Sequence, residues 1–319
     1  MRKVSFFFDG EAQVSMGVRV FSNEIGLGGN LAAVIKGLDE KYRHLKAEIA
    51  MRLPKYPATV FISNSRQVGC SAELEFYTPA GKELAICGHG ALASSLALFP
   101  VSEESGSTEK IKVSTKNGLL TIKKNENGLF QLEMEKAKVI KFDFSPDEVI
   151  KLIGLNDPYS IDQRLPFHVT SAGISILLVP LSSRANLFSL SPNVREIKKW
   201  TEEKNLAGIY VYTPDVFNSR FTFHARCFNP RFNPLGEDVA TGVAAMSLAS
   251  VYAKKDEQII IEQGYILNSP SNIFVTKSLA DLIYMGGRVS LSSEKIDLNK
   301  LLAEVNNDPN SSPQRLLQS

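Results

Sequence analysis

The chain has 319 residues, of which 44% are apolar and 22% charged, and its net charge is +2 from 36 basic and 34 acidic side chains. These values are ordinary for a globular protein, and the length suits two domains better than one simple core. No segment clusters basic residues, which argues against a nucleic-acid partner. Three scattered cysteines without a paired spacing or a Cys/His cluster argue against a structural zinc site and favour a reducing, cytoplasmic setting.

The first apolar run, VSFFF at 4–8, ends at Asp9–Gly10. It is too short for a signal peptide or a spanning helix, so we expect a strand and no membrane partner. After the GLGGN turn at 26–30, Leu31, Val34, Ile35 and Leu38 recur at helical spacing, which predicts a helix over 31–45.

Elements of both kinds follow along the rest of the chain. Alternation and β-branched content predict strands at 18–22, 58–64, 72–78, 167–181, 207–213, 220–228, 258–264, 272–277 and 287–292, with a turned meander over 111–135. Helices are predicted at 45–53, after CGHG at 87–90, at 145–155, at 191–203 and at 240–253, the third and fourth each starting at Ser–Pro. The polar tail at 306–319 has a composition typical of disorder.

An internal repeat is the most informative pattern. FYTPAGKELAICGHGALASSLA and CFNPRFNPLGEDVATGVAAMSLA each read as a strand, a Pro-containing loop, a glycine turn and an Ala-rich helix. Gly90 and Gly242 fall at equivalent places, about half the chain apart. The repeat predicts two similar domains. A helix of small residues on every side is expected to be buried, with sheet around most of it.

A helix that opens at glycine presents backbone N–H groups and a positive dipole end, which suit a small anionic metabolite such as a carboxylate. The alternative is that the glycines only make sharp turns. Candidate binding residues are Gly88, Gly90, Thr241, Gly242 and Val243 at the two helix starts, with Gly264 and Ser271 at a further glycine turn. Phosphate-loop, nucleophile-elbow and HExxH motifs are absent, so no cofactor and no metal are expected.

Three side chains near these helix starts are candidate catalytic groups. Cys87 at a helix N-terminus could act as a nucleophile or an acid/base, although free cysteines are often simply buried. His89 could transfer protons, because an unperturbed histidine titrates near neutrality, or it caps the turn. Asp238 could complete an acid/base pair with His89, or it only favours the helix dipole. Arg226 and Arg231 could bind a carboxylate or lie solvated on the surface.

Five blocks, in order and at the right spacing, resemble the PhzF-like (phenazine-biosynthesis isomerase-like) family. They are VRVFSNEIGLGGNLAAVI, ELAICGHGALA, HVTSAGISILLVPL, RCFNPRFNPLGEDVATGVAAMSLA and EQGYILNSPSNIFV, and the resemblance covers residues 17 to about 292.

The resemblance implies an α+β fold of two pseudo-symmetric diaminopimelate-epimerase-like domains, with the active site between them. Each domain would be a mostly antiparallel sheet wrapped around a central Ala-rich helix. The implied domains are 1–125, completed by the strand at 284–292, and 126–283. The family works without a cofactor, is commonly a homodimer, and isomerises trans-2,3-dihydro-3-hydroxyanthranilate by proton transfer in its best-understood activity.

The family's motif residues match only in part. The motif histidine is His89, the motif aspartate is Asp238, and the TG glycine is Gly242. Val243 stands where a small hydroxyl residue usually follows, and Ala58 stands where a general acid/base glutamate is expected. The prediction is an isomerase acting on a small carboxylate-bearing metabolite. The alternative is a catalytically silent member that binds a metabolite or a protein.

A third possibility comes from the thiol. CGHG is similar to the first thiol motif of proline-racemase-type enzymes, which share this fold and use two cysteines. The second position, in EDVATG, has no cysteine, so Cys87 would have to work with a partner such as Asp238.

Overall fold

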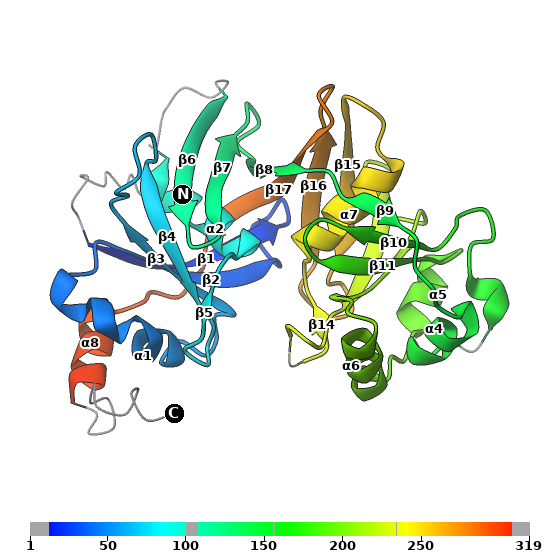
Figure 1. Ribbon diagram of the computed structural model, residues 1–319, viewed down its shortest axis with the longest axis horizontal. Helices are drawn as coiled ribbons and strands as arrows, with labels where there is room; N and C mark the ends of the chain where they lie inside the picture. Colours follow the sequence, from blue (N-terminus) through cyan, green and yellow to red (C-terminus); the bar gives the residue numbers. More distant parts are fainter. Residues whose placement is uncertain (1–12, 100–107, 156, 234, 308–319) are drawn as a thin grey trace. The chain divides into compact units, whose positions relative to one another are not determined.

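The computed structural model describes residues 13–99, 108–155, 157–233 and 235–307, and these form two compact units of mixed sheet and helix (Figure 1). The first unit takes its described residues from Met1–Val20, Asn30–Phe130 and Val289–Ser319, and the second from Phe21–Gly29 and Gln131–Arg288. The predicted α+β mixture is confirmed at this level. The strand predicted at 4–8 and residues 308–319 of the predicted tail lie outside the described residues.

The first unit contains both antiparallel and parallel strand pairs. Its elements are β1 (Val14–Ser22), β2 (Asn30–Lys36), η1 (Glu40–Leu45), α1 (Lys46–Met51), β3 (Ala58–Ser63), β4 (Ala72–Tyr77), β5 (Glu83–Leu84), α2 (Gly88–Ala93), α3 (Ser95–Leu98), β6 (Glu109–Thr115), β7 (Gly118–Lys124) and α8 (Leu298–Asn306). β2 runs antiparallel to β1 and parallel to β3, and β4 pairs antiparallel with β3 and β5 but parallel with β6. A hairpin then joins β6 to β7.

The second unit repeats this order of pairings. Its elements are β8 (Phe130–Glu135), β9 (Lys138–Ile140), α4 (Pro146–Leu152), η2 (Pro158–Ser160), β10 (His168–Ser171), β11 (Ser175–Pro180), α5 (Arg184–Ser189), α6 (Val194–Glu203), β12 (Gly208–Thr213), β13 (Phe223–Phe228), β14 (Glu237–Asp238), α7 (Gly242–Tyr252), β15 (Glu257–Gln263), β16 (Ser271–Lys277) and β17 (Leu282–Leu291). β11 is antiparallel to β10 and parallel to β12, and β13 pairs antiparallel with β12 and β14 but parallel with β15. β15 and β16 then pair antiparallel, as β6 and β7 do.

These matching pairings correct the register of the repeat. β5 and β14 are both two-residue strands, and each is followed by a helix whose first residue is glycine, Gly88 in α2 and Gly242 in α7. Gly242 is therefore equivalent to Gly88 and not to Gly90. In this register Leu84 occupies the place of Asp238, and Cys87 the place of Thr241.

Each unit has a buried apolar cluster that joins its helices to its strands. In the first unit, Ile49 of α1, Phe61 of β3 and Leu302 of α8 belong to one buried cluster. In the second, Val149 of α4 and Trp200 of α6 belong to another. In the Ala-rich helix α7, residues 244–249 are all buried, which confirms the burial expected of a helix of small residues.

The helix predicted over 31–45 is wrong. The structure has strand β2 over Asn30–Lys36, followed by the short 3-10 helix η1. Leu31 and Leu38 are only partly buried, whereas residues 32–35 are all fully buried. A strand buried on both faces gives a continuous apolar run, which short-range periodicity cannot distinguish from one face of a helix.

Helix boundaries needed smaller corrections. The helix predicted at 191–203 begins at Val194, because the Asn193 side chain, and not Ser191, accepts the capping hydrogen bond from Glu196 N. Two helices, α5 and α8, were not predicted, and Asn306, assigned to the polar tail, is the last residue of α8. Ser145 does hold the N-cap position of α4, followed by Pro146.

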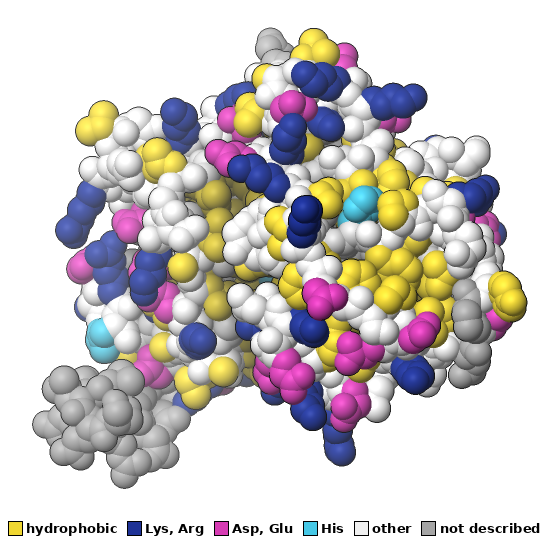
Figure 2. Space-filling view, turned by 45° about the vertical axis from the view of Figure 1, so that its right-hand side comes forward, with side chains coloured by type: hydrophobic (Ala, Val, Ile, Leu, Met, Phe, Trp, Pro, Cys, Tyr) yellow, Lys and Arg dark blue, Asp and Glu magenta, His cyan; other side chains and the backbone are white. Residues whose placement is uncertain are grey.

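The described residues contain no helix that is both long and apolar enough to cross a membrane. On the face shown in Figure 2, basic and acidic side chains are interspersed, and no large area carries one sign of charge.

Candidate functional site

The helix start in the first unit brings a thiol against an imidazole. Cys87 is the N-cap residue of α2, with extended backbone, and its carbonyl accepts a hydrogen bond from Ala91 N at 2.9 Å. Cys87 Sγ lies 3.5 Å from His89 Nδ1 and is nearly buried, with 8% exposure. Two of the three predicted catalytic side chains are therefore in contact with each other.

Small residues let α2 approach the sheet. A Cβ on Gly90 would lie 3.0 Å from both Phe76 Cδ1 and Val60 Cγ2. Ala58, where the family motif has a glutamate, is fully buried on β3. Since side chains alternate along a strand, Ala58 shares a face with Val60 and therefore with the side of β3 that meets α2. That face of the first unit carries a methyl group at the position of the expected acid.

The helix start in the second unit carries a polar network instead. Thr241 is the N-cap residue of α7, and its carbonyl accepts from Ala245 N at 3.0 Å. Its hydroxyl donates to Asp238 Oδ2 at 2.8 Å. Asp238 is held on β14 opposite Cys227 of β13. The predicted aspartate is thus fixed by both the sheet and the residue that opens the helix.

Gln263, the last residue of β15, connects these groups, and the sequence prediction missed it. Its amide nitrogen donates to Asp238 O at 2.7 Å and to Thr241 Oγ1 at 3.1 Å. Its amide oxygen accepts from Thr241 N at 3.2 Å and from Tyr210 Oη at 3.1 Å. Its position directly before Gly264 was the one available signal, because a residue beside a required turn is well placed to reach the loop that the turn faces.

Gly264 and Ser271 shape the loop beside this network. Gly264 has φ +84°, and a Cβ there would lie 2.3 Å from Ser269 O and 2.6 Å from Val239 O. Only glycine fits such a conformation and such a close backbone approach. The fully buried Ser271 hydroxyl donates to Ser269 O at 2.8 Å and accepts from Gly29 N at 2.9 Å. Ser271 therefore holds two loops together with the hydroxyl that we expected to bind substrate.

The ionisable groups beneath Asp238 are kept neutral. Burial, with the nearby charge of Asp238 as a smaller cause, raises the pKa of the Cys227 thiol above its ordinary value. Burial likewise raises the pKa of Tyr210 well above that of a free phenol. Both side chains act in this network as neutral groups at physiological pH.

Each of the two readings proposed for the arginines holds in part, since Arg226 binds a carboxylate of the protein itself and Arg231 is exposed. Arg226 is buried and makes a bidentate pair with Glu237, with both N–O distances 2.8 Å, and it also donates to Leu187 O. Arg231 Nη1 donates to the carbonyls of Thr201 and Leu206, at 3.3 and 2.6 Å. The hydrogen-bond partners of both arginines come from residues that are distant in the sequence.

His224 of β13 is enclosed among buried side chains. Its Nδ1 lies 2.7 Å from Glu262 Oε2, and both side chains are almost completely buried. The rings of Phe188, Phe217 and Tyr265 surround the imidazole.

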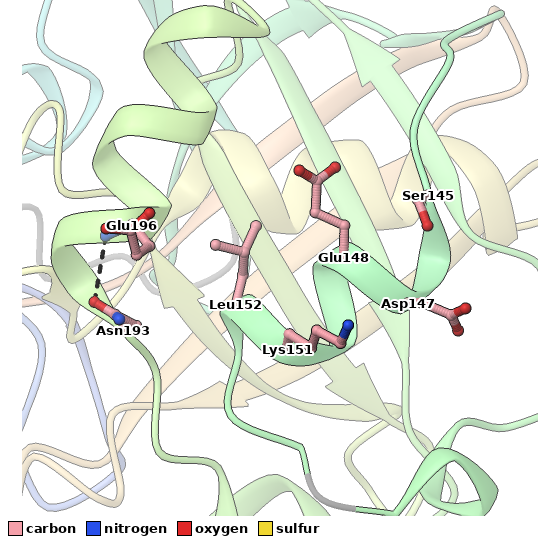
Figure 3. A pocket seen from close by; sticks show the side chains of 7 residues that line it. All are labelled: Ser145, Asp147, Glu148, Lys151, Leu152, Asn193 and Glu196. Atoms are coloured by element: carbon pink, nitrogen blue, oxygen red, sulfur yellow. Dashed lines mark hydrogen bonds between the residues drawn. The ribbon is translucent and has the colours of Figure 1, made fainter.

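One surface pocket lies elsewhere. A pocket of about 640 Å³ lies along α4 and at the start of α6, and it is lined by Ser145, Asp147, Glu148, Lys151, Leu152, Asn193 and Glu196 (Figure 3). None of the predicted site residues lines it. Its carboxylates sit in the first turns of the two helices, where they complement the helix dipole. Within the described ranges, no group of His, Cys, Asp and Glu side chains is arranged to hold a metal ion.

Comparison with known proteins follows the blocks seen in the sequence. The sequence model of the phenazine biosynthesis-like proteins (PhzC-PhzF) matches residues 18–292. The chain is 27% identical over 291 residues to an uncharacterized isomerase of Bacillus subtilis, YfhB, covering 88% of this chain and 94% of YfhB.

Solved structures share the fold at low identity. A phenazine biosynthesis protein of the PhzF family from Bacillus anthracis superposes with a TM-score of 0.71 at 22% identity, over 89% of this chain and 98% of that one. A hydroxyproline epimerase from Agrobacterium vitis, solved with bound trans-4-hydroxy-L-proline, gives a TM-score of 0.56 at 12% identity, over 95% of each chain.

Proposed function

Because the chain belongs to the family of phenazine biosynthesis-like proteins, we propose that it is an isomerase that moves a proton on a small carboxylate-bearing metabolite. The similarity to an isomerase over most of both chains supports this reaction class. The fold shared with an epimerase of a small amino acid is compatible with it.

The finer parts of the proposal rest on the family resemblance. The reaction is of the trans-2,3-dihydro-3-hydroxyanthranilate isomerase type and needs no cofactor. Each unit is one epimerase-like domain whose sheet wraps its Ala-rich helix. The protein works as a cytoplasmic homodimer, with neither a nucleic acid nor a membrane as partner.

Asp238 and His89 are the proposed acid/base pair. In the forward direction the Asp238 carboxylate takes a proton from a substrate carbon, and the His89 imidazolium returns one to another carbon, so the substrate is isomerised without net gain of protons. The first N–H groups of a helix have no partner within it, and at Gly242 and Val243 they are the proposed donors to the substrate carboxylate. Gly88 and Gly90 open the corresponding helix in the first unit, where Cys87 assists His89 by contact.

The observation that carries the proposal is the fixed Asp238 carboxylate. Its Oδ2 accepts from the Thr241 hydroxyl at 2.8 Å, immediately before the start of α7. A carboxylate placed in this way beside backbone donors can take a proton from a carbon of a substrate whose own carboxylate those donors bind. An aspartate that only stabilised the dipole would not need this second support.

The test is deuterium incorporation from D₂O into hydroxyanthranilate-like compounds and small amino and hydroxy acids, followed by mass spectrometry. We expect exchange into at least one compound with the wild-type protein, and at least a hundredfold slower exchange after Asp238→Asn, as general acid–base catalysis contributes about 10²–10⁴-fold. Asp147→Asn, in the surface pocket, is the matched control and should exchange normally. Equal rates in Asp238→Asn and wild type would reject the site.

The alternative function is a silent member that binds a metabolite or a protein partner. The buried Ala58 favours it, because a methyl group cannot transfer the proton assigned to the family glutamate. Calorimetric binding of a carboxylate from the panel, with no exchange from D₂O into any member, would support this second function.

Racemase-type chemistry at Cys87 makes a different prediction. It requires that alkylation of the thiol abolish exchange and that a substrate protect against alkylation. This chemistry would use the Cys87 thiol that contacts His89. Cys87→Ser with normal exchange would exclude it.

A further inference from the structure

We infer that Gln263 is the positioning residue of this site: its side-chain amide sets the orientation of Asp238 and Thr241. The inference rests on the proposed function, in which Asp238 is the proton-transferring carboxylate. Gln263 is fully buried at the end of β15, and both polar atoms of its amide are engaged at the start of α7.

The orientation of the Gln263 amide is determined by its partners. A backbone N–H can only donate, so the atom facing Thr241 N at 3.2 Å is the amide oxygen. A backbone carbonyl can only accept, so the atom facing Asp238 O at 2.7 Å is the amide nitrogen. A flipped amide would break both hydrogen bonds at once.

This fixed orientation also sets the direction of the next hydrogen bond. The amide nitrogen donates to Thr241 Oγ1 at 3.1 Å, which makes that hydroxyl an acceptor toward Gln263. The hydroxyl proton of Thr241 is then directed to Asp238 Oδ2 at 2.8 Å. Gln263 thus determines, through Thr241, which way the Asp238 carboxylate is turned and which oxygen receives the bond.

Gln263 is itself held from two sides. Tyr210 Oη donates to its amide oxygen at 3.1 Å from β12, the strand on the other side of β13. The parallel pairing of β13 with β15 places Ala225 opposite Gln263, and Gly264 turns the chain immediately afterwards. A buried, fully hydrogen-bonded amide loses little entropy when the substrate binds, which is what a positioning residue requires.

At the equivalent place, the described residues of the first unit make different contacts. The strand that corresponds to β15 is β6, which ends at Thr115, and the Thr115 hydroxyl donates to Gly118 O within its own hairpin turn. The corresponding helix start has Cys87 at its N-cap, and the Cys87 thiol lies 3.5 Å from His89 Nδ1. The hydrogen bonds among Gln263, Thr241 and Asp238 therefore distinguish the helix start of the second unit, where the proposed carboxylate lies.

The test is a double-mutant cycle with Gln263→Met and Thr241→Val, measured as kcat and KM of the deuterium exchange. Each single variant should lower kcat by about tenfold or more with a smaller change in KM, which corresponds to about 1.4 kcal/mol of lost transition-state stabilisation. The double variant should be no slower than the slower single variant, because both remove one chain of hydrogen bonds. Thr241→Ser, which keeps the hydroxyl, should restore kcat.

Controls separate positioning from folding. Gln258→Met changes an exposed glutamine on the same strand and should leave kcat unchanged. Tyr210→Phe removes only the hydrogen bond from Tyr210 Oη to the Gln263 amide oxygen, so it should lower kcat less than Gln263→Met does. This variant tests the inference if Gln263→Met does not fold. The inference would be overturned if the fold-loss of kcat in the double variant equalled the product of the two single losses. A wild-type kcat in Gln263→Met would also overturn it.

A second readout does not depend on activity. Hydrogen exchange of the Thr241 amide should be about tenfold faster or more in Gln263→Met, because that N–H donates to Gln263, while the amide of Leu248 in α7 stays protected. If the wild-type protein incorporates deuterium into none of the carboxylates, the proposed function fails. Unchanged protection of the Thr241 amide in Gln263→Met would overturn the inference about Gln263. Lost protection at Thr241 with α7 intact would support it.

Discussion

The two helix starts, Gly88 in the first unit and Gly242 in the second, follow the same strand pairings and carry different side chains. At the first, Cys87 lies against His89. At the second, Thr241 joins Asp238 to Gln263. The pairing order that positions a helix start is thus repeated within the chain, while the groups that could do chemistry there are not.

The preceding strands differ in the same way. Phe76 lies opposite Leu84 in the first unit, and Cys227 lies opposite Asp238 in the second. Next to them, the exposed Lys116 pairs with Glu83, whereas the buried Arg226 pairs with Glu237. The second unit therefore places more charge in its interior, and its interior should respond more strongly to substitution.

The largest effect is expected for Gly264→Ala. A Cβ there meets two backbone carbonyl oxygens, and neither can yield as a flexible side chain could. We expect a loss of more than about 3 kcal/mol in the free energy of unfolding, measured by urea denaturation. The control is Gly128→Ala in the first unit, also at positive φ but with open space around it, which should lose about 1–2 kcal/mol. Equal losses would mean that the loop beside Asp238 adapts.

The next effect compares the two glutamates of the short strands. Glu237→Gln removes one partner of a buried ion pair and should cost about 3–5 kcal/mol in the free energy of unfolding. Glu83→Gln removes the partner of the exposed Lys116 and should cost about 1 kcal/mol or less. Raising the salt concentration should weaken only the Glu83 pair. A larger loss for Glu83→Gln would contradict the contrast between the two interiors.

A smaller effect is expected for Tyr210→Phe. It removes one hydrogen bond to Gln263, whose amide oxygen still accepts from Thr241 N. Thermal unfolding should report a loss of about 0.5–1.5 kcal/mol, the usual net value of one such bond. Val60→Ile, at the equivalent strand position of the first unit, provides a packing change without a hydrogen bond. A neutral Tyr210→Phe would show that Gln263 needs no support from β12.

The smallest effect is a pH dependence that Tyr77 gives to the first unit. Burial, with the charges of Glu75, Glu83 and Glu48, raises the pKa of Tyr77 to about 12, whereas the equivalent residue of the second unit is Phe228. The folded state then binds more protons than the unfolded state above pH 10, so this contribution to stability is complete below pH 10 and falls as pH rises toward 12. In a pH titration followed by tyrosinate absorbance, Tyr77→Phe should lack one ionisation step near pH 12 that the wild type shows. A titration of that side chain near pH 10 would contradict this environment.

Much of this organisation could be predicted from the sequence. The two Gly-opened helices, most strands and the hairpin turns were correct because their signals are local: glycine, Asx-Gly and alternation. The helix predicted over 31–45 failed because β2 is buried on both faces and reads as a continuous apolar run. The register of the repeat failed by two residues, because two glycines flank His89 and only the strand pairings identify the equivalent one.

The candidate site was harder to predict than the fold. Asp238 and His89 were proposed from motifs, but Gln263 has hydrogen-bond partners that are distant in sequence, Tyr210 and Asp238. Arg226 was proposed for a substrate carboxylate, and only the fold shows that Glu237, across two paired strands, already neutralises it. Contacts of this kind depend on strand pairing, which no local pattern in a single sequence specifies.

The most direct test of the account is the rate of deuterium exchange from D₂O into a carboxylate substrate, measured for wild type, Asp238→Asn and His89→Gln side by side. We expect exchange in the wild type and a loss of about a hundredfold or more in each variant, with both variants folded. Exchange that survives Asp238→Asn at the wild-type rate would contradict it and would remove the polar network at Gly242 from the chemistry.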